Sequence, residues 1–177
     1  ITVQHLLTHT AGLANTYRGL TQTDFQAMSA QTKPGDTVGD MLEGLATLPL
    51  NFHPGERWEY GRATDVVGRL VEVMSGQTLD AFLRARIFDP LGMVDTDFYV
   101  PDSKLDRFAV NYVPKPGGGM QAADHPQISP YRKLPALEMG GSGLVGTVGD
   151  YRRFAQMLLN KGTTTANAYS DEKPSSS

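Results

Sequence analysis

Five stretches of the chain carry apolar residues at helical spacing. The clearest stripe runs from Val66 to Met74 and ends at Gly76. The other four begin after threonines, a residue type that caps helix N-termini, and these are Thr2, Thr37, Thr78 and Thr147. An aspartate three residues after Thr37 and after Thr147 resembles a capping box. The pattern therefore predicts five helices.

Glycine and proline set the expected ends of these helices. Gly12 is placed to end the first helix in a left-handed conformation, and Pro49 stops the second. The step from Asp89 to Pro90 should close the helix that begins after Thr78, because a residue before proline avoids helical backbone angles.

Outside the predicted helices, the pattern indicates short strands and a C-terminal tail. Apolar side chains alternate with others between Phe108 and Tyr112, which predicts a strand, and residues 114–119 then turn the chain. The sequence thus predicts an α-rich α+β fold with two or three short strands. Residues 163–177 are small and polar, so we expect a disordered tail after a domain that spans residues 1–162.

Composition narrows the classes of function. The 177 residues are 40% apolar and 20% charged, as in an ordinary globular domain. A net charge of −3 with no block of like charges gives no support to a nucleic-acid or anionic-membrane partner, and no stretch approaches the roughly 20 apolar residues of a membrane span. The absence of cysteine excludes disulfides and thiol chemistry. The first eleven residues do not resemble a signal peptide, and the cellular compartment stays unknown.

Two short motifs suggest a bound metal or cofactor, and both are better explained by structure. His5 and His9 stand four residues apart, but a zinc protease would need glutamate where Leu6 stands, so we expect a hydrogen-bonding pair and no metal site. Residues 141–146 read G-x-G-x-x-G without a β-branched strand before them. We therefore expect a turn that leads into a helix, and no cofactor.

Two serines were weighed as nucleophiles. Ser142 fails the G-x-S-x-G pattern because Leu144 occupies the place of the second glycine. Ser170 and Lys173 match S-x-x-K by letter, yet they stand in a polar tail where the lysine would keep its solvation. An independently active hydrolase that uses either serine is therefore the weakest of the hypotheses.

A tyrosine precedes the strongest helix. Tyr60 ends the run FHPGERWEY and is followed by Gly61, Arg62 and the helix from Ala63. From residue type alone, such a tyrosine is more often a packed aromatic with a bonded hydroxyl than a functional group.

Four segments of the sequence make a functional role for Tyr60 the better interpretation. They are residues 1–13 (ITVQHLLTHTAGL), 52–72 (FHPGERWEYGRATDVVGRLVE), 88–100 (FDPLGMVDTDFYV) and 140–162 (GGSGLVGTVGDYRRFAQMLLNKG). In this order and at these separations they closely resemble the serine β-lactamase-like hydrolases. Within that superfamily they are most similar to the family VIII carboxylesterases, relatives of class C β-lactamases and penicillin-binding D-Ala-D-Ala peptidases. The resemblance extends from Ile1 to about Gly162.

The resemblance implies a mechanism with an acyl-enzyme. Such enzymes use the serine of S-x-x-K as nucleophile, with the lysine and a tyrosine moving the proton. Tyr60 occupies the place of that tyrosine, and it would act as a base only beside positive charge, because a free phenol has a pKa of about 10. Arg62 replaces the asparagine of the Y-x-N element, which favours esters over β-lactams. Arg62 would then either contact an acyl substrate or form a surface salt bridge.

The resemblance also implies missing parts. The S-x-x-K helix would lie before Ile1, and the strands with the K-T-G-like element and an oxyanion donor would follow the last helix. We therefore expect the helical middle portion of the β-lactamase and penicillin-binding-protein fold with its central sheet largely missing, inactive alone. Its substrate in the complete enzyme would be a small-molecule ester. Apolar residues meant for the sheet would be exposed and would promote self-association or binding of a complementing chain.

Two further hypotheses stay open beside this one. The chain could be a non-catalytic binding or interaction homologue, or the corresponding piece of a β-lactamase or D-Ala-D-Ala peptidase.

Overall fold

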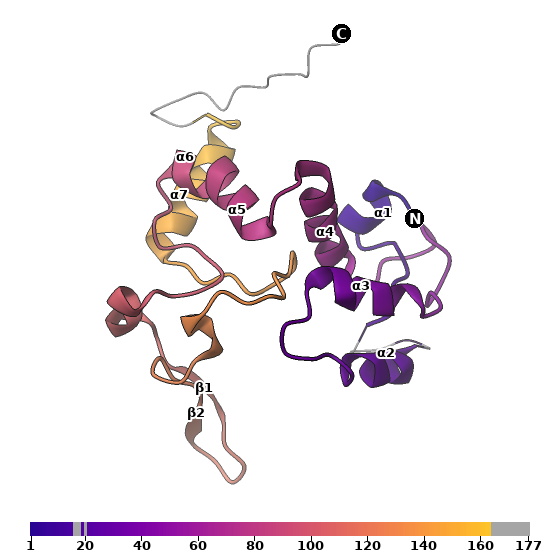
Figure 1. Ribbon diagram of the computed structural model, residues 1–177, viewed down its shortest axis with the longest axis horizontal. Helices are drawn as coiled ribbons and strands as arrows, with labels where there is room; N and C mark the ends of the chain where they lie inside the picture. The colour runs from indigo at the N-terminus through magenta and orange to yellow at the C-terminus, as the bar shows by residue number, and fades with distance from the viewer. Residues whose placement is uncertain (16–18, 20, 164–177) are drawn as a thin grey trace.

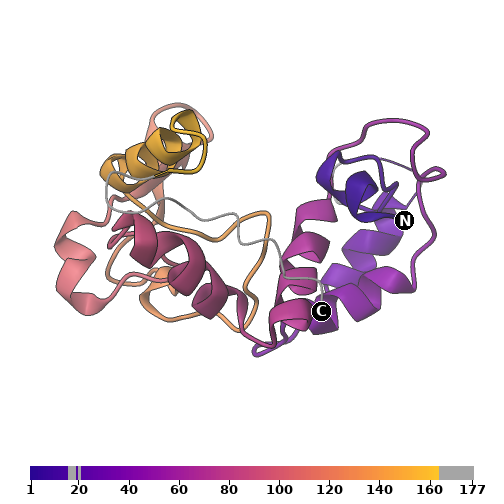
Figure 2. The ribbon, with the colours of Figure 1, turned by 90° about the horizontal axis from the view of Figure 1, so that it is seen from above.

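The computed structural model describes residues 1–15, 19 and 21–163, and these form two helical lobes (Figure 1). One lobe contains α1 to α4, and the other contains α5 to α7 with a two-stranded hairpin. Figure 2 shows the lobes side by side, with α4 on the side of its lobe that faces the other. The α-rich α+β expectation is confirmed, since the described residues hold one sheet of two strands.

The first lobe is built from capped helices. They are α1 (Val3–Leu7), α2 (Gln22–Ser29), α3 (Val38–Ala46) and α4 (Ala63–Ser75). Thr2 and Thr37 each form the expected N-cap, and the Thr37 box with Asp40 is complete, with each side chain bonded to the other residue's backbone N–H. Gly76 ends α4 in the left-handed conformation, as predicted.

The first helix is shorter than the sequence suggests. It ends at Leu7, because His9 takes a left-handed φ of 53° and its N–H bonds the Leu6 carbonyl, three residues back, instead of continuing the i−4 pattern. Gly12 serves a different purpose from the predicted helix end. A Cβ there would lie 2.3 Å from the Phe52 carbonyl oxygen, so only glycine allows this approach of two loops.

Helix α2 was not predicted. Its one fully buried side chain is Phe25, which packs with Ala14 and Leu45 in the core of the first lobe. Met28, three residues later, packs against the same cluster, but two apolar contacts in eight residues are too few to show a helical period in the sequence.

The second lobe opens with one continuous helical stretch. It consists of α5 (Leu79–Leu83), a π-helical turn (Arg84–Phe88) and α6 (Asp89–Leu91), and it ends at left-handed Gly92. The prediction that the Asp89–Pro90 step closes the helix is wrong. Hydrogen bonds in the π turn run from i to i−5, so the i−4 ladder that Pro90 would break is already interrupted there.

A hairpin follows in the second lobe. A 3₁₀ turn (Asp102–Arg107) comes before β1 (Asn111–Pro114), which pairs antiparallel with β2 (Met120–Asp124). The strand begins three residues later than predicted, because Phe108 caps the 3₁₀ turn and packs its ring edgewise on Tyr131 at 6.1 Å. A further 3₁₀ turn spans Pro130–Arg132.

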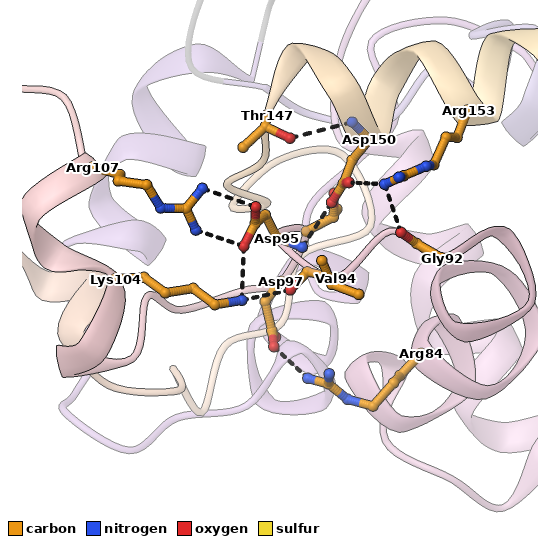
Figure 3. A network of polar contacts seen from close by, with 11 residues as sticks. Arg84, Gly92, Val94, Asp95, Asp97, Lys104, Arg107, Thr147, Asp150 and Arg153 are labelled. Carbon is orange, nitrogen blue, oxygen red and sulfur yellow. Dashed lines mark hydrogen bonds and ion pairs between the residues drawn. The ribbon is translucent and has the colours of Figure 1, made fainter.

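Helix α7 (Val148–Leu159) is fixed to the loop after α6 by a polar network (Figure 3). The buried Asp150 carboxylate accepts from the Asp95 N–H at 2.7 Å and the Thr96 hydroxyl at 3.0 Å. The predicted Thr147 box is therefore half present: the Thr147 hydroxyl accepts from the Asp150 N–H, but the carboxylate bonds the distant loop instead of returning to Thr147. This long-range use of a capping residue closes the second lobe.

Apolar side chains gather in separate clusters within the two lobes. Two adjoining clusters, centred on Leu6 and Phe25, lie in the first lobe, and Phe88, Leu91 and Met93 form the centre of the second. Several large apolar side chains of α7 remain exposed, and they are Val148 (88%), Tyr151 (71%), Leu158 (59%) and Leu159 (77%). Such exposure is expected of a helical portion whose central sheet is missing.

Candidate active site

Tyr60 lies on an irregular segment three residues before α4, with Arg62 as the N-cap residue. The tyrosine is 47% exposed, and its ring rests on the ring of His9 with centroids 4.9 Å apart. The segment is held by the backbone as well, because the Glu59 N–H donates to the His9 carbonyl at 2.9 Å. The phenol is therefore presented to solvent from a supported position.

A buried polar network lies beneath this segment. The Glu59 carboxylate, whose side chain is 11% exposed, accepts from the amides of Asn15 at 3.2 Å and Asn51 at 2.8 Å. The Asn51 side-chain oxygen in turn accepts from the hydroxyl and N–H of Thr21 at 2.7 and 3.1 Å. Satisfied buried networks of this kind restrict a loop to one conformation, so the backbone beside Tyr60 is pre-set.

Arg62 is directed toward the protein. Its Nη1 lies 3.4 Å from Asp65 Oδ2, and its guanidinium lies over the Phe25 ring at 5.3 Å. Its side chain is 26% exposed. Arg62 thus forms a salt bridge, but with a buried partner rather than at the surface as expected, while the expected contact with an acyl substrate stays a prediction.

A cavity of about 80 Å³ separates Tyr60 and Arg62 from the loop at Gly141 and Ser142. Asp65, almost fully buried, joins the two sides: its Oδ1 accepts from the Gly141 N–H at 2.9 Å. Sequence reasoning missed Asp65 as a site residue, because its partner is 76 positions away. The three glycines among residues 140–143 were the available signal, because glycine allows the backbone of another segment to approach closely.

Ser142 shares this cavity with Tyr60, but the residues that line it include no lysine or histidine. The Ser142 hydroxyl donates to the Met139 sulfur at 3.6 Å. The lysine that the family resemblance requires beside a nucleophilic serine is therefore not among the residues that line this cavity. Ser170 lies outside the described residues, as does the predicted tail from position 164 onward.

The histidines and the glycine-rich motif have structural explanations. His5 Nδ1 accepts from the Thr2 N–H at 3.3 Å as part of the first cap, whereas His9 has left the helix, so the two do not form a pair. Within the described part of the chain, no three potential ligands gather as a metal would need. Residues 141–146 form a loop that pairs Val145 with Asp97, as expected of a turn before a helix. Among the helices of the described residues, none has the length and apolar character to cross a bilayer.

Burial and charge shift the pKa values of two carboxyl groups, Asp95 and Glu138. Hydrogen bonds from Arg107 and Lys104 hold the pKa of Asp95 well below its usual range (Figure 3). Burial raises the pKa of Glu138, whose carboxylate accepts from the Asp80 N–H at 2.8 Å. Glu138 thereby anchors the start of the loop that forms one wall of the Tyr60 cavity.

Comparison with known proteins supplies the family. The chain is 33% identical over 160 residues to lovastatin esterase of Penicillium rubens, covering 90% of this chain and 40% of that one. It is 33% identical over 183 residues to esterase EstB of Burkholderia gladioli, covering 89% and 44%. Among solved structures, a mutant of simvastatin synthase from Aspergillus terreus matches with a TM-score of 0.71 at 29% identity, covering 91% of this chain and 36% of that one.

The chain thus spans about 40% of the length of these relatives. The relatives share the fold that the sequence resemblance implied, and the described residues correspond to a helical part of it. The beta-lactamase family model matches residues 1–176, and the chain accordingly belongs to this family of serine hydrolases and esterases.

Proposed function

We propose that residues 1–163 are the tyrosine-bearing part of a serine hydrolase that cleaves carboxylic esters through an acyl-enzyme. The observation that carries this is the placement of Tyr60, half exposed, on a loop that a buried network holds beside a cavity. The esterases among the relatives support the choice of ester substrates. Tyr60 would receive the proton of the nucleophilic serine and return it to the leaving alcohol.

The nucleophile and its lysine would come from the longer polypeptide. The cavity beside Tyr60 is lined by no lysine, and Arg62, the cation among its lining residues, already pairs with Asp65, so the chain alone should not turn over esters. General acid–base steps contribute about 10²- to 10⁴-fold, and they are useless without the group they serve.

Arg62 would contribute to the choice of an ester. Its guanidinium has five N–H donors and gives one of them to Asp65, so others can reach a substrate oxygen that enters the cavity. This role would replace the amide contact that an asparagine makes in the Y-x-N element.

The test uses the chain extended by the coding sequence that flanks it. Tyr60→Phe should lower kcat for p-nitrophenyl acetate at least 100-fold, while Tyr112→Phe, an exposed hairpin residue, should leave it unchanged. The circular dichroism of both variants should match the parent. An undiminished rate in Tyr60→Phe would remove the tyrosine from the mechanism, and an extended polypeptide without esterase activity would refute the proposal.

We also propose that the exposed apolar face of the second lobe makes the chain alone self-associate. A groove of about 610 Å³ between α5 and α7 is lined mainly by apolar side chains, among them Phe88, Val148 and Phe154. Sedimentation should show dimers or larger species at micromolar concentration, and Val148→Glu should reduce them. A monomer over the whole range would refute this.

A further inference from the structure

We propose that the apolar groove beside the Tyr60 cavity binds an unbranched aliphatic chain of the ester substrate. The inference rests on the proposed function and assigns a second subsite to it. The groove has a volume of about 420 Å³ and runs between α4 and the loop at 139–144. It shares Thr64, Gly141 and Ser142 with the Tyr60 cavity, so a substrate held at Tyr60 can extend directly into it.

The lining of the groove is almost wholly hydrocarbon. Leu79 and Phe98 are buried at its base, and half-buried Val67, Val71 and Leu83 line its length. No charged side chain contributes to it, and the two hydroxyl side chains, Thr64 and Ser142, lie where it meets the Tyr60 cavity. This polarity matches a ligand with a polar ester at one end and a saturated chain at the other.

The two walls approach each other through glycine. A Cβ on Gly68 would lie 2.9 Å from the Gly140 Cα, and a Cβ on Gly140 would lie 2.2 Å from the Thr64 carbonyl oxygen. The loop is therefore seated on the backbone of α4 at this point, and a side chain at either glycine would push the loop away. The resulting groove is open beyond the contact, toward Val71 and Leu83.

Hydrogen bonds hold the loop at three places along its length. The Glu138 carboxylate accepts from the Asp80 N–H at 2.8 Å, and the Gly141 N–H donates to Asp65. Val145 and Asp97 exchange two backbone hydrogen bonds at 2.8 and 3.1 Å. The groove is thus formed before a ligand arrives, so little ordering opposes binding of the chain.

Chain-length selectivity of the extended polypeptide tests the groove. Each methylene that enters should raise kcat/KM about fourfold, so p-nitrophenyl octanoate should exceed p-nitrophenyl acetate by at least tenfold. Val71→Phe fills the groove and should abolish this preference, so that the ratio of the two kcat/KM values falls to about one. Val73→Phe, an exposed position on the same helix outside the groove, is the matched control and should keep the preference.

A second variant guards against misfolding. Leu144→Trp narrows the groove from the loop side at a position that is 46% exposed, so it should fold and show the same loss for octanoate. Octyl acetate distinguishes the two halves of the ester: if the variants depress its hydrolysis instead, the groove takes the alcohol chain. Equal losses for long and short esters of both kinds, or an unaltered preference in both variants, would overturn the proposal.

A binding measurement separates this proposal from the proposed function. Titration of the 177-residue chain with sodium decanoate in a calorimeter should give saturable heat that Val71→Phe and Leu144→Trp remove and Val73→Phe keeps. Binding with these effects but no esterase activity in the extended polypeptide would refute the function and retain the groove. Tyr60-dependent hydrolysis without chain-length preference or decanoate binding would refute the groove alone.

Discussion

Removing the Asp65 carboxylate should loosen the candidate site more than its position in a helix suggests. The side chain is 4% exposed, and its two oxygens serve two segments: Oδ1 accepts from the Gly141 N–H at 2.9 Å and Oδ2 pairs with Arg62 at 3.4 Å. Asp65→Ala removes both contacts and leaves the Gly141 N–H without its partner. The loop then loses the middle one of its three attachments.

The structure sets the size of the effect. A hydrogen bond to a charged acceptor contributes about 1.5–3 kcal/mol. The Arg62 pair adds about 0–1 kcal/mol, because the guanidinium is partly in solvent. Relief from burying a carboxylate opposes these losses, so Asp65→Ala should lower the free energy of unfolding by about 2–3 kcal/mol. Asp65→Asn keeps an oxygen for Gly141 and should cost about 1 kcal/mol.

Urea unfolding followed by circular dichroism measures these differences. Asp24→Ala is the matched control, because Asp24 is also an acidic residue in a first helical turn but is exposed, so its loss should cost less than about 1 kcal/mol. Hydrogen exchange at the Gly141 amide adds a local readout: protection should vanish in Asp65→Ala and persist in Asp65→Asn. An Asp65→Ala variant within about 0.5 kcal/mol of the parent, with Gly141 still protected, would refute the reasoning.

Other perturbations have equally definite outcomes. Asp150→Ala removes the acceptor of the Asp95 N–H and the Thr96 hydroxyl in the second lobe, while Arg153 keeps its bond to the Gly92 carbonyl, and should cost about 3–5 kcal/mol in urea unfolding. Gly140→Ala should lower stability by about 1–3 kcal/mol through its clash with α4, whereas Gly149→Ala in α7, where a Cβ would meet the Thr147 hydroxyl at an unstrained 3.7 Å, should raise it by about 0.5–1 kcal/mol in thermal melts. The depressed pKa of Asp95 means that its ion pairs stabilise the fold above about pH 4 and are lost as pH falls toward the folded value, so Asp95→Asn should lose less melting temperature than the parent between pH 5 and pH 2.

Local signals in the sequence were sufficient for several elements. The Thr37 cap needs only Asp40, three residues away, and Gly76 needs only its own freedom at positive φ, so both were predicted correctly. The same reasoning misplaced the end of the first helix, because Gly12 is required by the close approach of the Phe52 backbone and not by the end of the helix. Pro90 was misjudged because a π turn cannot be read from residue spacing.

In the candidate site, too, the sequence predicted the local features but not the long-range contacts. The place of Tyr60 before α4 follows from the loop and helix pattern, and its candidacy follows from the family resemblance. The partners that organise it do not, because Glu59 with Asn15 and Asp65 with Gly141 are joined across 44 and 76 positions. Sequence patterns of period two or 3.6 carry no information at such separations.

The electrostatics of the cavity explain why residues 1–163 should need the remainder of a longer polypeptide for activity. A phenolate at Tyr60 would require adjacent positive charge, and among the residues that line the cavity the cation is Arg62. Asp65 already pairs with Arg62 and, through Gly141, fixes the opposite wall. The pair therefore contributes position more than net charge, and the charge that would activate Tyr60 has to arrive with the nucleophile. Tyr60→Phe should accordingly lower kcat severely in the extended polypeptide, where that charge is present.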